Sequence, residues 1–226
     1  AIDVNASGNI QFTGNLSGSS INAHGGTSGV GNVLIDAITA SAGTQSYRAG
    51  NGSGNVAFVS IDPNAAFSGV TTFTLRQDAA IPDVGIPTAG QFLSGVSGIS
   101  YTLQSDGGTI TLDTASKVAG SNLTLIGTGV TINPAVTLAS LSVTGPLTVG
   151  SGGAITTTAG DLVITNGLAG LSTGTFFTAQ SGKVVLGGGT AGANDLTITG
   201  DEIDITAALS GTGQLVLQSF TTSRDI

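Results

Sequence analysis

Short strand-like triplets recur through the second half of the chain, and most of them place an apolar residue on each side of a Thr or Ser. They are Leu123-Thr124-Leu125, Val130-Thr131-Ile132, Val136-Thr137-Leu138, Leu141-Ser142-Val143, Leu147-Thr148-Val149 and Leu162-Val163-Ile164, with a weaker one at Ala154-Ile155-Thr156. Successive side chains of a strand point to opposite faces, so the first and third residues of a triplet share one face. The pattern predicts short strands that bury their first and third residues and expose the central one.

The triplets also repeat at a longer period. Every third strand starts at one of Tyr101, Leu123, Leu141, Leu162 and Val184, so the pattern returns after roughly a score of positions. Repetition at about twenty residues is typical of a solenoid whose coils bury inward side chains against their neighbours. Gly, Asn, Asp and Ser between the triplets suit tight corners, whereas a β-sandwich expects longer strands at spacings of about 8 to 12 residues. We therefore predict an all-β, right-handed parallel β-helix (solenoid) of about 20-residue, three-strand coils.

The first half of the chain is less regular. Its candidate strands are Ile2-Asp3-Val4, Asn9-Ile10-Gln11-Phe12, Val33-Leu34-Ile35, Val56-Ala57-Phe58-Val59, Phe73-Thr74-Leu75, Tyr101-Thr102-Leu103 and Ile110-Thr111-Leu112. Residues 78–98 contain Pro82, Pro87 and Gln91-Phe92 and break the rhythm. We interpret them as a long loop or small extrusion on a single β-helix segment that spans residues 1–226.

Composition narrows the class of protein further. The 226 residues include 37 Gly but no Cys, Met or Trp, and 39% are hydrophobic while only 8% are charged. This combination disfavours disorder, and the shortage of strong helix formers disfavours helices. The net charge of −8 disfavours nucleic acid as a partner, because phosphate binding needs Lys and Arg. The apolar runs are too short to span a bilayer.

Two segments resemble the filamentous-haemagglutinin-like repeats of large bacterial adhesins and exoproteins. Leu215-Val216-Leu217-Gln218 followed by Ser223-Arg224-Asp225-Ile226 is similar to the family's strand, short turn and Arg-Asp-Ile unit. The stretch from Ile38-Thr39-Ala40 to Gly43-Thr44-Gln45-Ser46-Tyr47 resembles its Gly-x-Gln-x-Tyr turn. The resemblance implies a right-handed β-helix shaft in an exported protein.

The resemblance and the composition together predict a structural or adhesive role. We expect a non-enzymatic shaft segment of a secreted or cell-surface bacterial protein, monomeric as a fragment, that attaches to a glycan or protein on host or neighbouring cells. The absence of a start Met and a signal peptide at Ala1 is interpreted as excision from a longer precursor, and zero Cys is compatible with export. Because β-helices also host polysaccharide lyases and hydrolases, a glycan-active enzyme or a glycan-binding module is the alternative.

The densest acidic group is the candidate metal site. Glu202 and Asp204 would share the outward face of a strand and Asp201 precedes them, so these three carboxylates could hold Ca²⁺ weakly, since that ion prefers several oxygen ligands. A solvated acidic face is the alternative, and no other cofactor is expected. Lys183, the nearest basic residue in sequence, would come close through the stacking of coils about 4.8 Å apart. No catalytic residue is assigned.

The irregular segment supplies the candidate binding residues. Arg76, Phe92 and Tyr101 lie in or near residues 78–98, and loops often carry function. The alternative is that the two aromatic rings only pack this loop onto the shaft. The sole histidine, His24, is expected in a surface turn, and the isolated Asp113 and Asp161 are expected to accept hydrogen bonds at turns.

Overall fold

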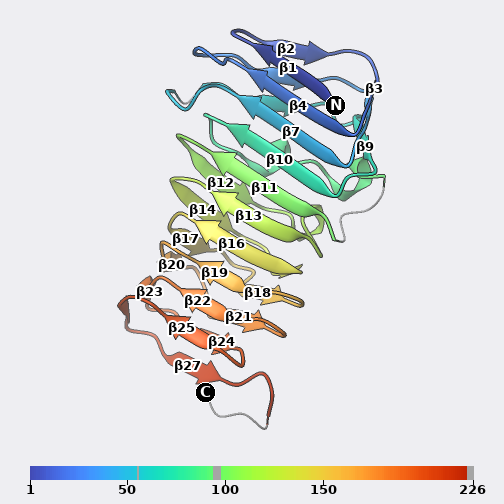
Figure 1. Ribbon diagram of the computed structural model, residues 1–226. Helices are drawn as coiled ribbons and strands as arrows, with labels where there is room; N and C mark the ends of the chain where they lie inside the picture. Colours follow the sequence, from blue (N-terminus) through green and yellow to red (C-terminus); the bar gives the residue numbers. More distant parts are fainter. Residues whose placement is uncertain (55, 94–97, 223–226) are drawn as a thin grey trace.

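The chain folds as a parallel β-solenoid of about ten turns, with coils of about 22 residues. A computed structural model describes residues 1–54, 56–93 and 98–222, and Figure 1 shows their strands stacked into an elongated rod. All strand pairs of the described residues are parallel, and each residue pairs with one that lies a single coil away in the sequence, as Leu123 does with Leu141 and Phe73 with Tyr101. The predicted all-β parallel β-helix is confirmed.

Each coil contributes one strand to an unbroken sheet, which we call wall 1. Its ten strands are β1 (Ile2–Ala6), β4 (Ser20–Gly25), β7 (Thr44–Ala49), β10 (Thr72–Gln77), β11 (Ser100–Ser105), β13 (Asn122–Ile126), β16 (Ser140–Thr144), β19 (Leu162–Ile164), β22 (Val184–Leu186) and β25 (Ile203–Ile205). The predicted coil starts pair in the predicted order, Tyr101 with Leu123, then Leu141, Leu162 and Val184.

The other two walls are interrupted between their N-terminal and C-terminal sheets. Wall 2 contains β2 (Ile10–Phe12), β5 (Val33–Ile35) and β8 (Val59–Ile61), then β12 (Thr109–Leu112), β14 (Gly129–Ile132), β17 (Leu147–Val149), β20 (Leu168–Leu171), β23 (Gly189–Gly192) and β26 (Leu209–Gly211). Wall 3 contains β3 (Leu16–Ser17), β6 (Thr39–Ser41) and β9 (Ala66–Ser68), then β15 (Val136–Leu138), β18 (Ala154–Thr157), β21 (Thr175–Ala179), β24 (Leu196–Thr199) and β27 (Leu215–Gln218).

Residues 78–93 are built into these two walls rather than attached outside them. Ile81 forms a parallel bridge with Ile110 in wall 2, and Phe92 forms one with Phe67 in wall 3. The 3₁₀ turns η1 (Asp83–Gly85) and η2 (Ala89–Gln91) replace strands in this coil, and η3 (Ala115–Lys117) replaces one in the next. Prolines suit this irregular backbone because they lack the N–H that a sheet ladder needs. Residues 78–93 are thus an irregular, loop-like part of the coil rather than an extrusion, and residues 94–97 of the predicted segment lie outside the described residues.

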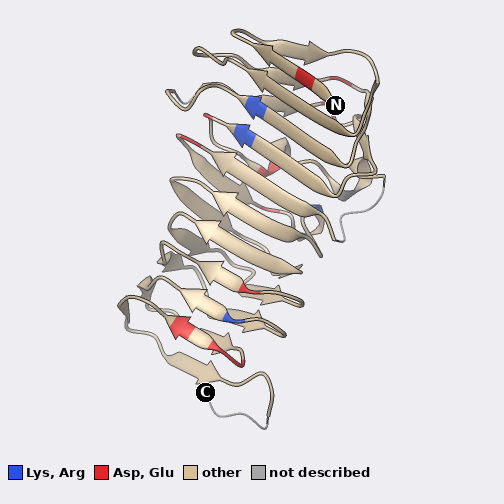
Figure 2. Cartoon of the chain, in the orientation of Figure 1, with Lys and Arg blue, Asp and Glu red and all other residues tan. Residues whose placement is uncertain are grey.

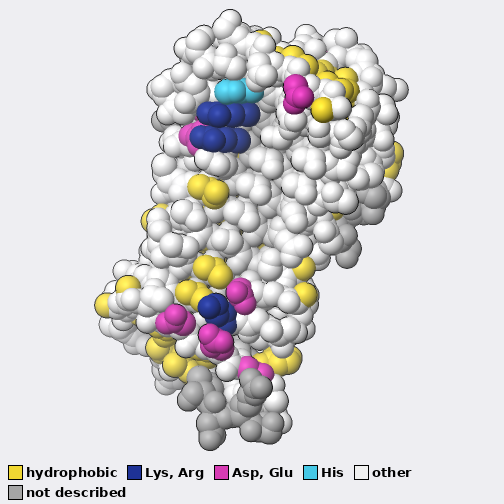
Figure 3. Space-filling view, viewed as in Figure 1, with side chains coloured by type: hydrophobic (Ala, Val, Ile, Leu, Met, Phe, Trp, Pro, Cys, Tyr) yellow, Lys and Arg dark blue, Asp and Glu magenta, His cyan; other side chains and the backbone are white. Residues whose placement is uncertain are grey.

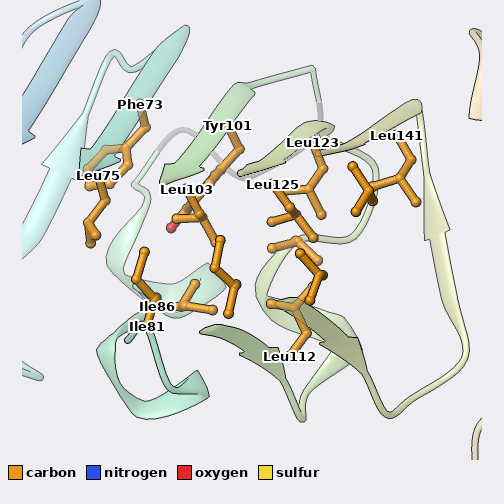
Figure 4. Packing of buried hydrophobic residues seen from close by; sticks show 14 of the residues in the cluster. Phe73, Leu75, Ile81, Ile86, Tyr101, Leu103, Leu112, Leu123, Leu125 and Leu141 are labelled. Atoms are coloured by element: carbon orange, nitrogen blue, oxygen red, sulfur yellow. The ribbon is translucent and has the colours of Figure 1, made fainter. Parts of the chain in front are cut away.

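The interior is filled by the first and third residues of the triplets. In β14, β17 and β19 the two flanking residues are buried and the central residue is half-exposed, as the alternation predicts. Figure 4 shows the stacking of inward side chains from neighbouring coils, such as Tyr101, Leu123 and Leu141. Full burial of one aliphatic side chain of this size contributes about 1.5–3 kcal/mol, so the repeated interior is the main source of stability.

One strand prediction and one turn prediction in the first half are wrong. Val56-Ala57-Phe58-Val59 was expected as a strand, whereas β8 begins only at Val59. The segment from Gly43 to Tyr47 was expected as a turn, whereas Thr44–Ala49 is β7, with Tyr47 buried. The related unit at residues 223–226 lies outside the described residues.

Candidate functional site

The acidic group of the C-terminal coils forms an open surface depression together with Lys183. Lys183 and Glu202 each precede paired residues of wall 1, Val184 and Ile203, so they lie one above the other. Asp161 occupies the same position one coil earlier, before Leu162. These three residues line the depression with Gln180, Ser181, Gly182 and Asp201, around a volume of about 630 Å³. We call it the acid–lysine depression. Figure 3 shows acidic side chains gathered around a basic one near the C-terminal end.

Two of the carboxylates in the depression are already hydrogen bonded to the next coil. Asp161 Oδ1 accepts the backbone N–H of Lys183 at 3.0 Å. Asp201 Oδ1 accepts the Ser219 hydroxyl at 3.0 Å and the Thr221 backbone N–H at 2.7 Å, and its Oδ2 accepts the Thr221 hydroxyl. Both acids thus tie successive coils together. Asp161 and Glu202 are exposed, whereas Asp201 is half-buried.

The three predicted metal ligands are not arranged as a metal site, although Glu202 and Asp204 are both exposed as predicted. Asp201 and Glu202 line the acid–lysine depression, but Asp204 is the central, exposed residue of β25 and does not. Within the part of the chain that the structure describes, no group of three or more His, Cys, Asp and Glu side chains is arranged to hold a metal ion. The stacking of Lys183 near Asp201 and Glu202 is confirmed.

The three predicted binding residues are also separated, because two of them are interior. Phe92 and Tyr101 retain only 3% and 0% of their exposed area, while Arg76 is on the outer face of β10. They therefore do not form one binding surface, and burial of the rings matches the alternative in which they pack the irregular segment. His24 lies within β4 rather than in a turn, and it is half-buried.

The buried rings form a continuous aromatic cluster in the middle of the rod. Phe73 lies at its centre, with ring centroids 5.7 Å from Tyr47, 5.3 Å from Phe67, 5.4 Å from Phe92 and 5.3 Å from Tyr101. Edge-to-face and tilted pairs at these distances are favourable. Burial raises the pKa of the Tyr47 and Tyr101 hydroxyls well above the usual value, so both rings act as neutral packing groups.

A buried ion pair, not predicted from the sequence, fastens η1 to η3. Lys117 Nζ lies 3.0 Å from Asp83 Oδ2, which also accepts the Thr114 hydroxyl at 3.0 Å, while Asp83 Oδ1 accepts the Asp113 backbone N–H at 3.0 Å. Burial alone would raise the pKa of Asp83, but these hydrogen bonds and the Lys117 charge outweigh it and hold the pKa below its usual value. The two partners come from different coils, so their pairing leaves no local sequence signal.

The chain was also compared with known proteins. No protein-family model, no curated protein and no solved structure matches it. Among the described residues, no helix has the length and apolar character needed to cross a bilayer. The fold and the arrangement of side chains are therefore the basis for a functional proposal.

Proposed function

We propose that the chain is a structural and adhesive shaft segment of a secreted or cell-surface bacterial protein, which mediates attachment to cells or glycans. The observation that supports this role is wall 1, whose ten parallel strands join edge to edge without interruption. Neighbouring strands are hydrogen bonded at a spacing of about 4.8 Å, and the interior is apolar. Such a rod is suited to hold a binding surface at a distance from the cell.

Adhesion is tested by coating beads with the chain and measuring their retention on cultured cells and on a glycan array, with and without Ca²⁺. The expected result is retention that does not require Ca²⁺ and that leaves the captured glycan intact. A chain that releases new reducing or unsaturated ends from a polysaccharide would contradict the shaft proposal. Beads coated with the heat-unfolded chain serve as the control for nonspecific capture.

A glycan-active enzyme is the second candidate, and the acid–lysine depression favours it. Lyases and hydrolases use carboxylates for proton transfer, together with a basic group, and Glu202 is an exposed carboxylate beside Lys183. If the depression is catalytic, Glu202→Gln removes polysaccharide cleavage while Asp204→Asn, outside the depression, preserves it. Equal cleavage by the two variants would exclude this role for Glu202.

A further inference from the structure

Three basic or titratable side chains form a column on the outer face of wall 1. His24 pairs in register with Arg48, and Arg48 pairs with Arg76, on the neighbouring strands β4, β7 and β10. Figure 2 shows the two arginines on adjacent strands, and Figure 3 shows them side by side with the histidine at the surface. The whole chain has only five Lys and Arg residues, so this basic column is a strong local concentration of positive charge on an acidic protein.

Arg48, at the centre of the column, has no partner in the described residues. The ion pairs found there are Arg76 with Asp106 and Lys117 with Asp83. Arg48 Nε is buried and no protein group accepts its hydrogen. Arg76 is the register partner of Arg48 on the neighbouring strand, and adjacent strands lie about 4.8 Å apart. Like charges at directly opposed positions of a sheet destabilise it, and a bound anion would offset this repulsion.

The residues on either side of Arg48 are held in place by other groups. Arg76 Nε donates to Asp106 Oδ2 at 2.8 Å, and Gln104 Nε2 donates to Asp106 Oδ1 at 2.7 Å. His24 Nε2 lies 2.9 Å from the Gly50 carbonyl oxygen, which can only accept, so this nitrogen carries the hydrogen. The Nη groups of both arginines are left neither buried nor hydrogen bonded to the described protein. They are free to donate outward.

We propose that the basic column binds a single oxyanion group, a carboxylate, sulfate or phosphate monoester, on a ligand that is otherwise neutral. A guanidinium donates two parallel N–H groups to such a group, and two stacked guanidinium groups can share its oxygens. A long polyanion is disfavoured because the net charge of the chain is −8. Asp106 pairs with Arg76, which leaves Arg48 as the guanidinium of the column without an ion-pair partner among the described residues. This site goes beyond the shaft role and does not depend on it.

The test compares anions by isothermal titration and by the thermal unfolding midpoint, in the complete chain. Sodium sulfate is compared with sodium chloride at equal ionic strength, and glucuronate is compared with glucose, which differs from it by the absence of the carboxylate. Sulfate and glucuronate are expected to bind and to raise the midpoint, whereas chloride and glucose do neither. Binding of sulfate without glucuronate supports the site and limits the group to tetrahedral anions.

Two variants and a charge-matched control locate the site. Arg48→Gln is expected to weaken anion binding at least tenfold, because hydrogen bonds to a charged group are lost. Arg48→Lys is expected to weaken it less, because the positive charge stays although the two parallel N–H donors of the guanidinium are lost. Arg224→Gln makes the same charge change at a position far along the sequence from the column and is expected to leave binding unchanged. In chloride, Arg48→Gln is expected to unfold at the same temperature as the parent chain or higher. Equal binding losses for Arg48→Gln and Arg224→Gln, or an Arg48→Gln variant that is less stable in chloride, would overturn the proposal.

Discussion

Two regions of the same solenoid solve the problem of filling a coil in different ways. In the regular region, residues 122–218, the coils are short, as between Leu123, Leu141 and Leu162 of wall 1, and the inward residues are mostly Leu, Val and Ile. In the irregular region, residues 44–121, the coils are longer, as between Phe73 and Tyr101, and aromatic rings fill the interior. The longer coils thus accommodate larger side chains, and they also contain the buried ion pair and both arginines of the basic column.

The largest difference between the regions is expected from removal of the central ring. Phe73→Ala removes contacts with four other rings and should lower the free energy of unfolding by about 3–5 kcal/mol. Tyrosine fluorescence during chemical unfolding measures this effect selectively, because Tyr47 and Tyr101 both lie in the irregular region and the chain has no Trp. Phe176→Ala, at a ring that is 55% exposed in the regular region, should change the free energy by less than about 0.5–1 kcal/mol. Similar losses for both variants would show that the cluster is not a distinct source of stability.

Breaking the buried ion pair should have the next largest effect. Lys117→Met leaves the Asp83 charge without its cation and should destabilise the chain by about 2–3 kcal/mol, somewhat below the range of about 3–5 kcal/mol for fully buried pairs. Because the pKa of Asp83 is lowered by folding, its contribution is present above its ordinary pKa of about 4 and is lost as the pH falls through the folded value. Urea unfolding of parent and variant at neutral and strongly acidic pH should therefore give a difference that shrinks in acid. Lys183→Met is the control, and a pH-independent difference would contradict the assignment.

A crowded corner of the regular region should tolerate substitution less well than an open one. Gly188 has φ of +78°, and a Cβ there would lie 2.4 Å from the Ala208 carbonyl oxygen of the next coil. Gly188→Ala should therefore lower the free energy of unfolding by about 1–3 kcal/mol. Gly174→Ala, where a Cβ would meet no atom within 4 Å, should leave the free energy of unfolding nearly unchanged. The thermal unfolding midpoints of the two variants and the parent chain measure the difference. Equal midpoints would show that the corner can relax.

The ionisation of the two buried tyrosines provides a test at alkaline pH, and it does not affect stability at neutral pH. Because burial raises both pKa values, the stabilising effect of the neutral hydroxyls is complete below the ordinary pKa of about 10 and is lost as the pH rises toward the folded values. The ultraviolet absorbance of tyrosinate should stay flat through the ordinary pKa and rise only together with the loss of β-sheet circular dichroism. A tyrosinate signal at about pH 10 with the sheet intact would contradict the buried aromatic cluster.

The strands between Leu123 and Ile164 could be predicted from the sequence one by one, because their signal is local, whereas β20, β21, β23, β24 and β26 were not assigned. The alternation in Val130-Thr131-Ile132 and the spacing of Leu123, Leu141 and Leu162 are set by the period of a strand and the length of a coil. The start of β8 and the strand β7 were misplaced because, at Val56 and Gln45, side-chain type does not match position. Val56 is exposed. Gln45 is a polar side chain in the interior, where its amide group accepts a hydrogen bond from the Tyr47 hydroxyl and donates to two backbone carbonyl groups.

The candidate sites were only partly predictable, since they depend on residues that the winding of the chain brings together. Lys183 could be placed near Glu202 once the coil length was known. The partnership of Asp83 with Lys117 required the path of an irregular segment. The column of His24, Arg48 and Arg76 crosses two coils that are longer than the regular ones and unequal to each other. Their lengths could not be extrapolated from the regular spacing.

The unbroken first wall gives the rod an adjustable length. The residues from Leu141 to Asp161 make up one coil, and Leu123 would meet Leu162 in the same register if that coil were removed. Loss or duplication of such a unit would move everything beyond it by about 4.8 Å along the axis while preserving the pairing on both sides. The length of the rod can therefore be changed in steps of one coil, by evolution or by design.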